Sequence, residues 1–229
     1  MSDNQGMGGY FVDIVMCIDA TGSMSPIIDE VKRNAVSFYQ QFVDSMEENQ
    51  KDVDQLRIKV IAFRDYGCDD EPMVESPFYT LPDDVDAFAS FVDSIEAMGG
   101  GDGPENALEA IALALKSDWT TGGSKRRHAI LVFSDAPALP LREREGTADY
   151  PDDMPENLAQ LGAWWHGTDQ TLASTYQPKA GRLVAFVPDA EPWSGIQEWN
   201  RYWPIFSKAG TGLDDVDLQE VIALMVGSF

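Results

Sequence analysis

The chain has 229 residues, of which 44% are hydrophobic, and its formal net charge at pH 7 is −23. The apolar fraction is typical of a folded globular protein. So negative a chain repels nucleic acid and anionic membrane surfaces and attracts cations and basic partners, so we expect it to bind neither nucleic acid nor membranes.

The N-terminus and the cysteine count indicate where in the cell the protein is located. The N-terminal stretch MSDNQGMGGY has no basic region followed by a long apolar run, and no window approaches 18 uninterrupted apolar residues. We therefore expect neither a signal peptide nor a membrane span. The two cysteines, Cys17 and Cys68, are too few for a disulfide framework, although they leave room for one bridge. A reducing cytoplasm is the expected location.

Apolar runs and helical periodicity alternate in the first half of the chain. The near-continuous apolar run 10–18 predicts a strand covered on both faces, as in a parallel sheet. Ser25-Pro26 is typical of a helix start with Ser25 as N-cap, and one amphipathic helix is predicted over 27–46. The next predicted elements are a strand at 56–64, an edge strand at 73–81 interrupted by Pro77, and helices at 85–98 and 106–119.

The second half continues the alternation. Strands are predicted at 128–136, 181–190 and 204–207, and helices at 156–167, at 193–203 and at 214–226, the last with Asp214 or Asp215 near its N-cap. The irregular connection 137–181 is long enough to indicate an insertion or a functional segment.

The alternation predicts an α/β fold with a doubly wound, mainly parallel central sheet flanked by helices. We expect a flexible N-terminus over 1–9 and one domain over 10–229, which includes the elaborated connection 137–181.

Carboxylates and hydroxyls gather where predicted strands end. Asp19, Thr21 and Ser23 follow the first strand, Asp135 ends a later one, and Asp102 precedes an apolar helix. Ligands of open parallel sheets bind beyond the carboxyl ends of the strands, at the point where the strand order reverses. Oxygen donors without imidazole or thiolate suit Mg²⁺, with Mn²⁺ or Ca²⁺ as alternatives, rather than zinc.

Three ordered motifs, DATGS at 19–23, GGGDGPE at 99–105 and FSDAP at 133–137, together resemble the von Willebrand factor A domain. The resemblance extends over about residues 10–226, and FRDYG at 63–67 is similar to segments of the soluble bacterial branch. It implies a Rossmann-like fold with a metal-ion-dependent adhesion site. Its metal residues would be Asp19, Thr21 and Ser23, joined directly or through water by Asp102 and Asp135.

The resemblance also implies a function. The chain would be a non-catalytic, divalent-cation-binding adaptor that docks another protein, with a protein kinase, a protein phosphatase or an AAA+ ATPase as the partner type. Asp102 stands where adhesive members usually have Thr. An added carboxylate makes the metal a weaker Lewis acid, so we expect tighter cation retention and weaker binding of a partner's carboxylate.

Other interpretations stay open from the sequence. Asp102 and Glu105 also fit a capping box, and Arg64, Asp65 and Tyr66 fit either the rim of the site or an ordinary loop start. A metal-dependent phosphatase-like hydrolase using Asp19 is the alternative function, but Thr21 replaces the second Asp that haloacid-dehalogenase phosphatases need. Ser23 has no evident His partner, and the turn lacks the Lys of a phosphate-binding loop. A scaffold that binds no metal is the third interpretation.

Overall fold

One mixed sheet forms the centre of the protein. The computed structural model describes residues 8–100, 103–208, 210, 213 and 216–229. Seven strands in these ranges form the sheet, in the order β3-β2-β1-β5-β6-β7, and β4 also pairs with β2. The parallel strands are β1 (Tyr10–Asp19), β2 (Val53–Phe63), β5 (Lys125–Phe133), β6 (Gly181–Pro188) and β7 (Tyr202–Ser207). The antiparallel ones are β3 (Met73–Glu75) and β4 (Tyr79–Leu81), so the predicted mainly parallel α/β class is confirmed.

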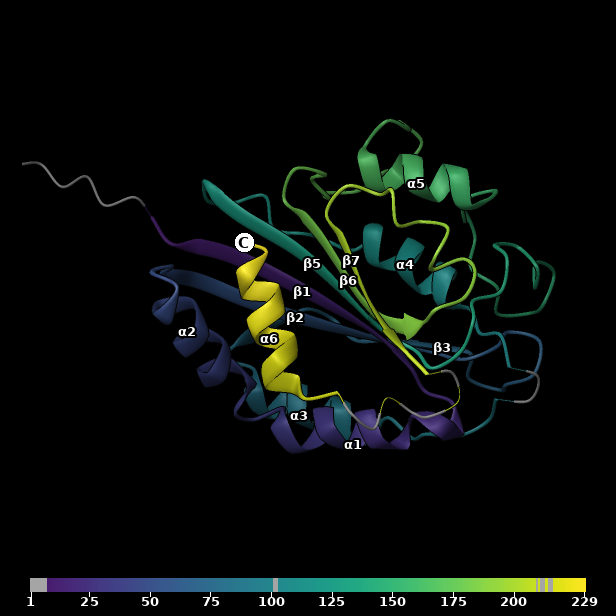
Figure 1. Ribbon diagram of the computed structural model, residues 1–229, viewed down its shortest axis with the longest axis horizontal. Coiled ribbons are helices and arrows are strands. Elements are labelled where there is room, and N and C mark those ends of the chain that lie inside the picture. The colour runs from purple at the N-terminus through teal and green to yellow at the C-terminus, as the bar shows by residue number, and fades with distance from the viewer. Residues whose placement is uncertain (1–7, 101–102, 209, 211–212, 214–215) are drawn as a thin grey trace, which may run out of the picture.

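Helices cover both faces of this sheet (Figure 1). One face carries α1 (Ser25–Asn34), α2 (Phe38–Glu48), α3 (Val85–Ser94) and α6 (Leu218–Gly227), and the other carries α4 (Ala107–Leu115) and α5 (Leu158–His166). Alternate residues of β1 supply the two cores. Ile14 and Met16 pack into the first, and Val15 and Cys17 into the second. A strand buried on both faces explains the unbroken apolar run.

The strand order places the site. β1 lies between β2 and β5, and the chain leaves β1 toward β2 but leaves β5 toward β6. The carboxyl ends of β1 and β5 therefore form the point at which the winding direction reverses, where α/β proteins bind ligands. Ile18 pairs with Phe133 at this end, so Asp19 and the residues after Phe133 emerge side by side.

The single helix predicted over 27–46 is wrong. Helices α1 and α2 are separated by a turn at 35–37, in which Ser37 N–H donates to Asn34 O at 3.1 Å. The Asn34 amide donates to Glu30 O and the Ser37 hydroxyl to Asn34 O, and such side-chain bonds compete with the helical ladder. Ser25 is the first residue of α1 rather than its N-cap, because η1 (Gly22–Met24) precedes it.

Two C-terminal predictions also need correction. The helix predicted over 193–203 is wrong, because residues 193–201 form successive turns that bury Trp193 and Ile196, and β7 begins at Tyr202. Helix α6 begins later than predicted, because Asp217 is its N-cap and accepts from Gln219 N–H at 2.8 Å. Asp214 and Asp215 lie outside the described residues. Across the described ranges, every helix is too short or too polar to cross a membrane.

Candidate metal centre

Asp19 ends β1 with its side chain fully buried. Its Oδ1 accepts from the N–H of Thr21 at 3.0 Å and from the Thr21 hydroxyl at 2.6 Å, and its Oδ2 accepts from the Ser134 hydroxyl at 2.8 Å. Burial raises the pKa of Asp19, the hydrogen bonds from Thr21 and Ser134 oppose the rise, and the charge of Asp135 adds to it. The turn after β1 is thus built on a buried carboxylate, whose ionised form a nearby cation would stabilise.

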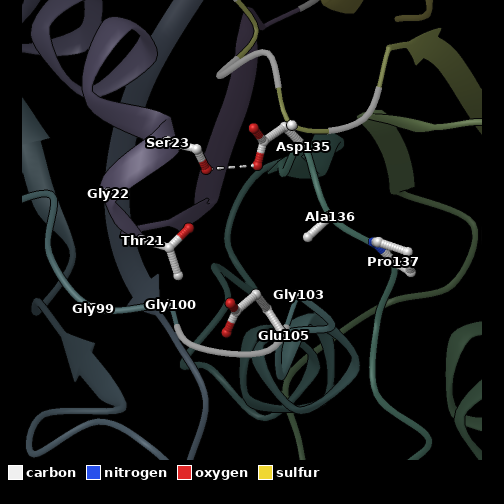
Figure 2. A pocket seen from close by; sticks show the side chains of 11 residues that line it. Thr21, Gly22, Ser23, Gly99, Gly100, Gly103, Glu105, Asp135, Ala136 and Pro137 are labelled. Atoms are coloured by element: carbon white, nitrogen blue, oxygen red, sulfur yellow. Dashed lines mark hydrogen bonds between the residues drawn. The ribbon is translucent and has the colours of Figure 1, made fainter.

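A cavity of about 430 Å³ opens beside this turn. Its polar lining side chains are Thr21, Ser23, Glu105 and Asp135. Figure 2 shows Ser23 and Asp135 facing each other at one side of the cavity, where the Ser23 hydroxyl donates to Asp135 Oδ1 at 3.0 Å. Glu105 lies on the opposite side (Figure 2). Two carboxylates therefore flank two hydroxyls around one hollow.

Two loops approach closely at this cavity. Met98 N–H donates to Ala20 O at 3.0 Å, and Gly22 N–H donates to Gly99 O at 3.4 Å. Gly100 has φ +81°, and a Cβ added there would lie 2.9 Å from Thr21 Cβ. Only glycine combines this backbone conformation with so close an approach.

The structure brings four of the five predicted metal residues together. Asp19 bonds Thr21, and Ser23 bonds Asp135, while Asp102 lies outside the described residues. The predicted capping box is wrong. Helix α4 begins at Ala107 with Asn106 as its N-cap, so Glu105 precedes the helix instead of standing in its first turn.

Glu105 and Ser134 are the site residues that sequence reasoning missed. Glu105 N–H donates to Pro137 O at 3.0 Å, and its carbonyl accepts from Leu139 N–H at 2.9 Å, so its side chain is fixed beside the Asp135 loop and is 2% exposed. Ser134 bonds Asp19 across the sheet. Both lie within the motifs GGGDGPE and FSDAP, but only the folded structure shows that Glu105 lines the cavity and that Ser134 bonds Asp19.

The FRDYG segment is a buried loop start rather than an exposed rim. Arg64 and Asp65 are 4% and 0% exposed, and Asp65 accepts from Arg144 Nε at 2.7 Å and Nη2 at 2.5 Å. Burial acts to raise the pKa of Asp65, but the hydrogen bonds from Arg144 and Gly67 N–H outweigh it and leave the pKa below its usual value. The pair anchors the 137–181 connection to the loop after β2.

The donor chemistry defines what the site can hold. No group of three or more His, Cys, Asp or Glu side chains suited to a metal ion is present among the described residues. The oxygens here are instead a mixture of carboxylates and hydroxyls, and a hydroxyl that donates its proton to a carboxylate keeps its lone pairs for a cation. Hard divalent cations prefer such oxygens, so the residues fit the metal that the resemblance implies.

Known proteins share this architecture. A von Willebrand factor type A protein from Catenulispora acidiphila superposes with a TM-score of 0.55 at 15% identity, covering 96% of this chain and 43% of that one. The pilus adhesin SpaC from Lactobacillus rhamnosus GG superposes with a TM-score of 0.54 at 8% identity, covering 96% of this chain and 31% of the adhesin.

Sequence comparison agrees with the fold. The alpha-protein kinase vwkA of Dictyostelium discoideum is 23% identical over 147 residues, which are 64% of this chain and 22% of the kinase. The chain thus spans about a fifth of that relative's length. Residues 13–146, more than half of the chain, match the family described as the von Willebrand factor A domain. The chain therefore belongs to the von Willebrand factor A domain family.

Proposed function

We propose that the cavity beyond β1 and β5 is a metal-ion-dependent adhesion site and that the protein is a non-catalytic protein–protein interaction module. Asp19, Thr21, Ser23 and Asp135 would hold Mg²⁺, with Mn²⁺ or Ca²⁺ as alternatives, and Asp102 would join them directly or through water. The observation that carries this proposal is the lining itself. Carboxylates and hydroxyls meet around the hollow, and none of the described lining residues is Lys, Arg or His.

The electrostatics support a cation. Asp19, Glu105 and Asp135 are each at most 3% exposed. Clustered buried carboxylates are costly unless a positive charge or hydrogen bonds compensate them. A bound divalent cation would supply that charge and offer a Lewis-acidic position to a partner. The chain's own residues would fix the turn and keep the hydroxyls aimed at the cavity.

The partner we propose is another protein. The kinds of partner we propose are a protein kinase, a protein phosphatase or an AAA+ ATPase, and the similarity to an alpha-protein kinase supports the first of these. Cys17 and Cys68, both of which the structure describes, form no disulfide with each other, which is consistent with the reducing cytoplasm that we propose as the location.

Thermal melting in EDTA and then in excess Mg²⁺ tests the metal site. A cation at about 100 times its Kd stabilises the folded state by about 2.7 kcal/mol, which raises Tm by about 5–10 °C for a chain of this size. We expect this rise in the wild type and in Asp29→Asn, a control that removes an exposed carboxylate on α1, but not in Asp135→Asn. A wild type that Mg²⁺ does not stabilise would favour the scaffold without metal.

The geometry disfavours the hydrolase alternative. Both oxygens of Asp19 accept hydrogen bonds that a nucleophilic attack on a phosphoryl group would have to break, and this supports the non-catalytic proposal. Hydrolysis of p-nitrophenyl phosphate in Mg²⁺ is the direct check. Turnover that Asp19→Asn abolishes would overturn the non-catalytic assignment.

A further inference from the structure

A buried arginine ties together the backbone behind the cavity. Arg64 follows β2 directly and is 4% exposed. Its Nε donates to Ala20 O at 3.0 Å, its Nη1 to Glu71 O at 2.6 Å and its Nη2 to Glu96 O at 2.7 Å. The three carbonyls belong to the turn after β1, the loop after β2 and the segment that leads from α3 toward Gly99.

Two of these segments line the cavity. Ala20 stands between Asp19 and Thr21, and its carbonyl also accepts from Met98 N–H. The main chain of Arg64 adds a further link, since its carbonyl accepts from Asn106 N–H at 3.2 Å at the start of α4. Arg64 is not among the lining residues, so it acts from behind the loops.

Only a guanidinium can make this arrangement. Its planar fork presents donors in fixed directions, whereas the ammonium of Lys is a single point. In the part of the chain that the structure describes, no carboxylate forms a salt bridge with Arg64, and its buried charge rests on neutral carbonyls. Separation of the three segments would break these hydrogen bonds and leave the buried charge uncompensated. Arg64 therefore opposes such a separation.

We propose that Arg64 is a positioning residue for the cation site. It sets the distance between the turn at 19–23 and the loop at 96–100, and so the place where the site's oxygens meet, without touching the cation. The effect on cation affinity rests on the proposed function, whereas the effect on the loops does not.

Arg57 provides a matched control. It lies within β2, away from the carboxyl end where the cavity opens, and its Nε and Nη2 donate to Asp13 at 2.8 and 2.6 Å. Arg57→Lys and Arg64→Lys each remove one guanidinium fork from β2 or its end, and both are expected to lower overall stability. Only Arg64→Lys is expected to disturb the loops around the cavity.

Hydrogen exchange without metal is the first readout. In Arg64→Lys we expect the Gly22 and Met98 amides to exchange about tenfold faster than in the wild type, because their acceptors are no longer held in place. Arg57→Lys should leave both amides at their wild-type rates. Unchanged rates in Arg64→Lys, or equal acceleration in both variants, would overturn the positioning role.

Titration calorimetry with Mg²⁺ is the second readout. Loss of an outer residue that orients metal ligands typically weakens affinity by about 10–100-fold, which we expect for Arg64→Lys but not for Arg57→Lys. Arg64→Gln, which is neutral and keeps an amide donor, replaces Arg64→Lys if the lysine variant does not fold. Wild-type affinity in the variant would refute the positioning role, whereas a wild type that binds no Mg²⁺ would refute the proposed function and leave hydrogen exchange to decide on Arg64.

Discussion

Substitution of Asp65 by Asn tests how the long connection is held. Asp65 accepts two hydrogen bonds from the Arg144 guanidinium and so joins the loop after β2 to the segment that follows Asp135. The Asp65 side chain is 0% exposed and that of Arg144 is 24% exposed. Asn retains the size of Asp but removes the charge and one acceptor oxygen.

The magnitude follows from this burial. Removal of one partner of a buried ion pair costs about 3–5 kcal/mol, because the other charge is left uncompensated. Arg144 reaches water in part, so we expect the lower end, about 3 kcal/mol. For a chain of this size, that loss lowers Tm by about 6–12 °C.

Urea and thermal unfolding followed by circular dichroism measure the loss, and a double-mutant cycle with Arg144→Met isolates the pair. The pKa of Asp65 is lower in the folded state than in the unfolded state. The ion pair therefore stabilises the fold fully above the unfolded-state pKa, near pH 4, and this stabilisation is lost as the pH falls through the lower folded-state pKa. The control is Glu30→Gln, whose partner Arg33 is 64% exposed and which should cost less than about 0.5 kcal/mol. A cost below about 1 kcal/mol for Asp65→Asn, or strict additivity in the cycle, would show that the Asp65–Arg144 pair does not stabilise the fold.

Three further predictions concern individual polar groups. Ser134→Ala should lower the free energy of unfolding in urea by about 1.5–3 kcal/mol, because it removes a hydrogen bond to the buried Asp19 carboxylate, whereas Ser37→Ala on the surface should change it little. Burial lowers the pKa of His128 to about 4, so its ring NMR signals should not titrate at neutral pH, and its contribution to stability should be lost as the pH falls from about 6.5 toward 4. Asp102→Thr should weaken Mg²⁺ binding and strengthen binding of an acidic ligand, and calorimetry that shows neither change would contradict this.

The sequence predicted the parts of the fold that depend on local pattern. A strand buried on both faces must be apolar throughout, so the run before Asp19 was sufficient to predict β1, and the motif order predicted the family. Asp19 and Thr21 bond each other within one turn, two residues apart. Such a contact is fixed by spacing in the chain and needs no knowledge of the sheet.

One error arises where local side-chain bonds interrupt a periodic pattern, and one omission where the contacts join distant parts of the chain. The apolar spacing over 27–46 continues across Asn34 and Ser37, and only their side-chain bonds to the backbone reveal the turn between α1 and α2. The triple contact of Arg64 was equally hidden, because its acceptors lie 44, 7 and 32 residues away. No spacing rule connects such positions.

The lining of the cavity also limits what a bound cation would do. Asp135 and Glu105 line the hollow, and Asp19 lies directly behind Thr21. Three ionised carboxylates around one divalent cation would leave a formal local charge of about −1, before any contribution from Asp102. A cation so neutralised attracts an external carboxylate weakly, and the chain's net charge of −23 repels an acidic partner further. The proposed site is therefore better suited to retaining its cation, ordering its loops and docking a neutral or basic partner than to capturing a Glu or Asp.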